Sequence, residues 1–147
     1  MSKAVLISIK PEWCEKIANG NKTIDLRKTR PKVETPFKCY IYCTKDKHGW
    51  FDFLKKERLD GKVIGEFMCD EDGIVNFWYP YGYNKRDCSA ILRAFACLSA
   101  NEIWEYGKGK TLYGWHISNL KIYDEPRELS EFGLKRPPQS WCYVEET

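Results

Sequence analysis

The residues best suited to chemistry lie in one short segment between Gly20 and Arg27. Lys22 offers a point cation, Thr23 a hydroxyl, and Arg27 a planar guanidinium that can hold two oxygen atoms at once. Asp25 adds a carboxylate, and the alternation of apolar and polar residues predicts that it shares a strand face with Thr23 and Arg27. The segment is therefore either an anion or nucleotide site at the mouth of a strand, or a solvated edge strand whose charges pair with neighbouring residues.

The spacing of these residues resembles a known signature. Gly20-x-Lys22-x-x-Asp25-x-Arg27 is similar to the G-x-K-x-x-E-x-R motif of ASCH domains (activating-signal-cointegrator homology domains), which belong to the PUA-like superfamily. Asp25 stands where the family usually has a glutamate, which is one methylene longer. Further blocks resemble small bacterial and phage ASCH proteins in the same order, at residues 7–11, 61–67, 114–120 and 137–141. The resemblance covers nearly the whole chain and implies a PUA-like β-barrel.

The elements predicted from periodicity agree with such a barrel. Strands are expected at residues 4–9, 22–28, 37–44, 62–69, 74–79, 111–123 and 141–144. Helices are expected at residues 11–19, 88–98 and 99–106, with one helical turn at 128–132 and a short helix or irregular insertion at 45–60. The strands at 62–69 and 74–79 are predicted to form a hairpin around a strong turn signal. The predicted fold class is α+β, a mixed barrel of about six strands with flanking helices, although periodicity alone does not distinguish it from an open sheet.

The composition indicates a single folded domain over residues 1–147. Apolar residues make up 43% of the chain and aromatic residues 15%, so a chain of this length can bury about two-thirds of its unfolded surface. The aromatic residues exceed what such a core needs, and some are expected to line a pocket or an interface. The net charge of +3 is too small to indicate a strongly electrostatic nucleic-acid binder, although basic residues concentrate between Lys22 and Lys62.

The cysteines predict free thiols in a reducing compartment. There are seven, an odd number, no C-x-x-C pair occurs, and no secretory segment precedes the first strand. Cys39 and Cys43 would lie about 13 Å apart along a strand, too far to share a tetrahedral zinc ion. No apolar run approaches the ~20 residues of a membrane span. We therefore expect a cytoplasmic protein with no metal and no cofactor.

The leading functional hypothesis is a module that binds RNA, or a natural or modified nucleoside or nucleotide. In this hypothesis aromatic rings stack on a base, Asp25 accepts a hydrogen bond from its amino edge, and cations hold phosphate. The loop from Lys28 to Lys32 would supply the salt-dependent part of the affinity. The two rings can equally be ordinary core residues, and a lone strand histidine is more often structural than catalytic. The predicted ligand-binding residues are Lys10, Lys22, Thr23, Asp25, Arg27, Tyr113, Trp115 and His116.

Two other function classes stay open. One branch of the ASCH family resembles amidohydrolases that remove an acyl group from N4-acylated cytidine with a lysine, a threonine and a distant glutamate. Lys22 matches the lysine and Glu102 is the candidate acid, but Asp25 stands at the threonine position, and a capping-box spacing already explains Glu102. The other class is a protein-interaction domain that uses aromatic loops around Trp50 and Tyr83. Ribonuclease activity is also associated with ASCH proteins, but this chain offers no recognisable pair of histidines for it.

Overall fold

The computed structural model describes residues 3–45, 59–75, 93–108 and 110–147. Most of the insertion predicted at 45–60, the end of the strand predicted at 74–79 and the start of the helix predicted at 88–98 lie outside these residues. Trp50 and Tyr83 lie outside them as well. The strands are β1 (Lys3–Ile9), β2 (Ile24–Arg27), β3 (Phe37–Cys43), β4 (Lys62–Cys69), β5 (Ile74–Val75), β6 (Leu112–Arg127) and β7 (Trp141–Glu145). The helices are α1 (Pro11–Ala18), α4 (Ala100–Gly107) and the 3₁₀ helix η1 (Leu129–Phe132). No helix of the described residues is long and apolar enough to cross a membrane.

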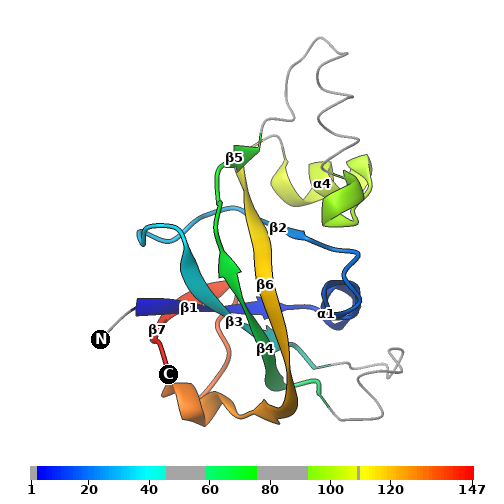
Figure 1. Cartoon of the computed structure of the whole chain (residues 1–147). Helices are drawn as coiled ribbons and strands as arrows, with labels where there is room; N and C mark the ends of the chain where they lie inside the picture. The colour runs from blue at the N-terminus through cyan, green and yellow to red at the C-terminus, as the bar shows by residue number, and fades with distance from the viewer. Residues whose placement is uncertain (1–2, 46–58, 76–92, 109) are drawn as a thin grey trace.

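The strands form one mixed sheet that curls into a half-barrel (Figure 1). Along the sheet the order is β2-β6-β4-β3-β1-β7, and β5 pairs with β6 beside this path. β1 and β3 run parallel, whereas the other paired strands are antiparallel. α1 and α4 flank the curled sheet (Figure 1). The predicted α+β class and the mixed barrel with flanking helices are confirmed.

One predicted pairing is wrong, because β4 and β5 do not form a hairpin. β4 pairs with β3 on one side and with β6 on the other, so both of its edges are occupied. β5 pairs with β6 instead. The residues between them stay on the same partner: the His116 N–H donates to the Glu71 carbonyl at 2.8 Å and the Gly114 N–H to the Gly73 carbonyl at 3.0 Å. The long strand β6 thus receives β4 and β5 one after the other.

The main core lies between the strands and the inner face of α1. This face presents Cys14 and Ile17, which pack with buried residues of β1 and β3. Trp115 of β6 is 0% exposed, and its ring meets that of Phe37 edge-on, with 5.7 Å between the centroids. The ring of Trp141 lies on another side of it, at 5.8 Å. Trp115 is therefore a core residue, and its large ring is buried among other aromatic side chains.

Local sequence signals set the ends of the helices and one close strand contact. Gly20 has a φ of +85°, a conformation that glycine adopts without strain, and it turns the chain from α1 towards β2. At the start of α4 the predicted capping box is confirmed: the Glu102 N–H donates to Ser99 Oγ at 3.1 Å, and the Ser99 N–H to Glu102 Oε1 at 3.0 Å. Gly65 lies at a close approach of β4 to β6, because a Cβ atom there would lie 2.5 Å from the Lys121 carbonyl oxygen.

Candidate functional site

Lys22 lies inside the protein, with a relative exposure of 2%. Its Nζ donates a hydrogen bond to the Ala96 carbonyl oxygen at 2.5 Å and lies 5.2 Å from the centroid of the Trp13 ring. Burial lowers the pKa of Lys22, and the nearby Asp25 carboxylate only partly opposes this effect. The ammonium group is therefore held by the protein itself, by a backbone oxygen and an aromatic face.

Asp25 and Arg27 form a buried ion pair. The Arg27 Nε atom lies 2.6 Å from Asp25 Oδ2. The two terminal nitrogens of the guanidinium donate to the Ser8 carbonyl oxygen at 2.9 Å, to Ser140 Oγ at 3.3 Å and to the Ser140 carbonyl oxygen at 3.4 Å. Burial alone would lower the pKa of Arg27, but the Asp25 carboxylate outweighs it and the pKa is raised. The guanidinium therefore donates through each of its three nitrogen atoms to groups of the fold.

This ion pair joins the two ends of the curled sheet. β2, which carries Arg27, is the first strand of the sheet order and β7 is the last. Arg27 bridges this gap to Ser140, the residue before β7. Two tryptophans reinforce the junction, since the Trp141 Nε1–H donates to Thr29 Oγ1 at 2.9 Å and the Trp115 Nε1–H to the Thr29 carbonyl oxygen at 3.3 Å. The charged motif thus closes the half-barrel through side chains where no backbone ladder does so in the described residues.

The three predicted site residues of β6 have different surroundings. Trp115 is enclosed in the core, so its ring has no free face for a base. Tyr113 is partly buried against the same core, and the guanidinium carbon of Arg30 lies 4.9 Å from its ring centroid. His116 is half-exposed, and its Nδ1 atom lies 2.7 Å from Asp70 Oδ1. The ring of Trp115 is therefore not accessible for stacking on a base as expected, and one face of the Tyr113 ring is already covered by the Arg30 guanidinium.

The other predicted residues do not converge with Lys22 into one open cleft. Lys10 is exposed at the N-cap of α1. Thr23 is half-buried, and its backbone bonds to Phe95 and Ile117 at 2.8 Å in each case. Glu102 is exposed and engaged in its capping box. Among the described residues, no hydrogen bond or ion pair joins Glu102 to Lys22, and no group of three or more histidine, cysteine, aspartate or glutamate side chains could hold a metal ion.

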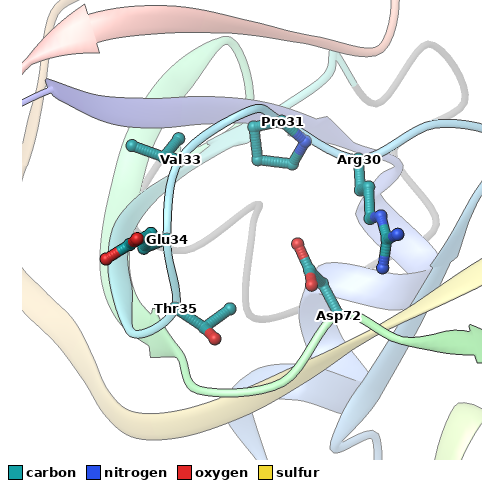
Figure 2. A pocket seen from close by; sticks show the side chains of 6 residues that line it. All are labelled: Arg30, Pro31, Val33, Glu34, Thr35 and Asp72. Atoms are coloured by element: carbon teal, nitrogen blue, oxygen red, sulfur yellow. The ribbon is translucent and has the colours of Figure 1, made fainter.

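An open cavity of about 430 Å³ lies next to this motif, between the loop from β2 to β3 and the connection from β4 to β5. Figure 2 shows Arg30 and Asp72 next to one another on one side of the ring of lining residues, while the Glu34 side chain points outward. From the sequence, this loop was predicted to contribute only the salt-dependent part of the affinity for RNA. The aspartates at 70 and 72 looked like turn residues, and the pairing of β5 with β6 is what brings Asp72 to the loop. The lining residues are Arg30, Pro31, Val33, Glu34, Thr35 and Asp72.

The basic residues of this loop stay accessible. Lys28, Arg30 and Lys32 are all exposed. The Lys28 Nζ atom lies 4.9 Å from the centroid of the Tyr106 ring, and the backbone N–H of Lys32 donates to the Tyr143 hydroxyl at 2.8 Å. The loop is therefore tied down by its backbone and by aromatic rings, while its charged groups retain donors for a ligand.

Comparison with solved structures identifies the architecture. The crystal structure of ASCH from Zymomonas mobilis aligns with 97% of this chain and 88% of its own, with a TM-score of 0.72 and 18% sequence identity. The chain has an ASCH fold. A tyrosine-to-phenylalanine mutant of the same protein covers 99% of this chain and 92% of its own at a TM-score of 0.72, and a serine-to-alanine mutant covers 97% and 89% at 0.71, both with 18% identity. Comparison with protein-family models and with curated protein sequences gives no match.

The resemblance read from the Gly20–Arg27 spacing is thus confirmed at the level of the fold. In this ASCH fold the motif contributes a buried amine and a buried ion pair. The accessible cations belong to the loop that follows it, and one of them, Arg30, lines the cavity.

Proposed function

We propose that the protein binds RNA or a nucleotide at the cavity framed by Arg30 and Asp72. The observation that carries this proposal is a guanidinium and a carboxylate that lie next to one another in the lining of an open cavity, with no ion pair recorded between these two described residues. The cavity volume of about 430 Å³ lies within the range of about 300–1,000 Å³ that small-molecule sites occupy. A nucleotide has the matching groups, since it presents anionic phosphate, base donors and base acceptors together.

Different residues around the cavity can bind different parts of a nucleotide. Arg30 can hold a phosphate or a base acceptor through its planar fork. Asp72 can accept hydrogen bonds from base amino groups. Pro31 and Val33 give the lining an apolar part, and Lys28 with Lys32 extends the positive charge along the loop, where a phosphate chain would lie. RNA therefore fits this face better than it fits the enclosed Lys22 and Arg27.

Fluorescence anisotropy with short single-stranded RNA, at two salt concentrations, tests the proposal. We expect Arg30→Gln to weaken binding by about tenfold or more, because a charge-assisted hydrogen bond is lost. Arg136→Gln is the matched control, since it removes the same group from an exposed position that does not line the cavity. RNA binding that is absent in the wild type at low salt, or that both variants weaken equally, contradicts the proposal.

A second candidate is an amidohydrolase acting on acylated cytidine, and the lowered pKa of Lys22 is the observation that favours it. A lysine with a lowered pKa is better able to act as a base near neutral pH. Against it, the amine is enclosed and Glu102 is engaged elsewhere. The test is incubation of N4-acetylcytidine with the wild type and with Lys22→Met, with the product measured by chromatography. Product that forms with the wild type and not with Lys22→Met establishes the hydrolase activity. No product with the wild type rules the hydrolase out.

A further inference from the structure

The backbone on both sides of Asp72 and the side chain of Arg30 are each held by contacts with β6. The residues on either side of Asp72 are fixed to β6 by the backbone bonds from His116 to Glu71 and from Gly114 to Gly73, at 2.8 and 3.0 Å. Arg30 rests on the Tyr113 ring at 4.9 Å. Because the Asp72 backbone and the Arg30 side chain are already ordered, a ligand would pay a smaller entropy cost for ordering them on binding.

A carboxylate next to a guanidinium can discriminate among the bases. The two oxygens of a carboxylate can accept from two adjacent N–H donors at once. Of the four RNA bases, only guanine presents two such donors side by side, its N1–H and N2–H₂ groups, with the O6 acceptor next to them. On adenine and cytosine the amino group is flanked by a ring nitrogen acceptor, and on uracil the imide N–H lies between two carbonyls, so one carboxylate oxygen would face a lone pair.

We propose that this cavity prefers guanine, with Asp72 accepting from N1–H and N2–H₂ and Arg30 donating to O6. The inference rests on the proposed nucleotide binding at the same cavity and adds the identity of the base. Thr35 lies on the same rim (Figure 2), and its hydroxyl can bond to the ribose or to an edge atom as donor or acceptor.

The direct test is a calorimetric titration of the full chain with the monophosphates of guanosine, adenosine, cytidine and uridine. We expect guanosine monophosphate to bind about tenfold more tightly than each of the others, because the mismatched bases leave a charged acceptor without a donor. Inosine monophosphate differs from guanosine monophosphate by the loss of the N2 amino group alone. It is expected to bind about tenfold more weakly than guanosine monophosphate.

Asp72→Asn supplies the protein half of the test, since it keeps the shape of the side chain and replaces one acceptor by a donor. It should weaken the binding of guanosine monophosphate by about tenfold and change the affinity for the other nucleotides much less. Glu71→Gln is the matched control, because it removes one negative charge at the neighbouring exposed residue. It should change the affinity for all four nucleotides by the same factor.

The failure of this inference and the failure of the proposed function look different. If the four monophosphates bind equally and Asp72→Asn leaves their ratios unchanged, the guanine preference is overturned while nucleotide binding stands. If neither the monophosphates nor short RNA bind the wild type, both proposals are overturned together.

Discussion

Lys22 and Arg30 carry the same formal charge and lie within one basic stretch, yet the structure encloses the first and exposes the second. Up to Arg27 the charged groups of this stretch are bonded to the protein, to the Ala96 backbone and to Ser8 and Ser140. From the next residue onward they are exposed. In the enclosed half Arg27 closes the sheet, and in the exposed half Arg30 lines a cavity.

The difference follows from the cost of removing a charge from water. A buried charge is tolerated only when its hydrogen-bonding groups find partners inside the protein, and those groups are then not free for a ligand. An exposed cation keeps its donors and can exchange water for phosphate or for a base. Similarity of charge along a sequence is therefore weak evidence for a shared role.

Removing the buried guanidinium is the strongest test of this contrast. Arg27→Met should lower the free energy of unfolding by about 3–5 kcal/mol, because it leaves the Asp25 carboxylate buried without its partner. Arg30→Met should change it by less than about 0.5 kcal/mol. Urea unfolding measures both. Adding Asp25→Leu to Arg27→Met should recover part of the loss, and a loss below about 1 kcal/mol for Arg27→Met would contradict the closing role of the pair.

Truncation of the buried lysine should have a smaller effect. We expect Lys22→Ala to cost about 2–3 kcal/mol, since it leaves a void next to Trp13 and the Ala96 carbonyl without its donor. Lys28→Ala, in the exposed half, should stay within about 0.5 kcal/mol. Lys22→Met keeps most of the volume and should cost less than Lys22→Ala. Equal stability of the two alanine variants would show that Lys22 is not structural.

Alkaline pH acts on the interior through its thiols. Burial raises the pKa of Cys69 to about 12, against 9.0 for an ordinary cysteine. The folded state therefore keeps a proton that the unfolded state releases, so the stabilisation is complete below pH 9 and is lost as the pH rises towards 12. Cys69→Ala should make the decline of stability above pH 9 less steep than in the wild type. Urea unfolding at a series of pH values measures the decline. If the free energy of unfolding falls equally steeply with pH in the wild type and in Cys69→Ala, this assignment is refuted.

The smallest effect concerns the salt dependence of RNA binding by the exposed half. Replacing Lys28 and Lys32 by glutamine together should reduce the slope of log K against log salt by about 0.7 for each phosphate that the loop no longer neutralises. The free energy of unfolding should not change beyond about 0.5 kcal/mol. Anisotropy over a range of salt concentrations measures the slope. An unchanged slope would place the RNA on another face.

Local signals anticipated much of the fold. The strands β1, β3 and β4 and the helix α1 lie where periodicity and caps predicted them, and the capping box of Ser99 and Glu102 forms with both of its bonds. The close approach at Gly65 also fits a local signal, because a glycine within a strand often marks such a contact. The pairing of β5 was not, because a turn signal states that the chain changes direction and does not state which strand edge is free to receive it.

The site was less predictable than the fold. Alternation placed Tyr113, Trp115 and His116 on definite faces of β6, but only the curled sheet decided that the face of Trp115 is the core. Arg30 and Asp72 belong to segments that come together through β6, so no local spacing relates them.

By itself the sequence determined the elements, their caps and a spacing that resembles the ASCH motif, because these depend on neighbours within a few residues. Only the tertiary structure decided which charges are internal. Arg27 is buried because β2 meets the start of β7, and Lys22 because the Ala96 carbonyl lies over it, and both partners are remote in sequence. Burial depends on such long-range packing, and it separates a residue that holds the fold together from one that can hold a ligand.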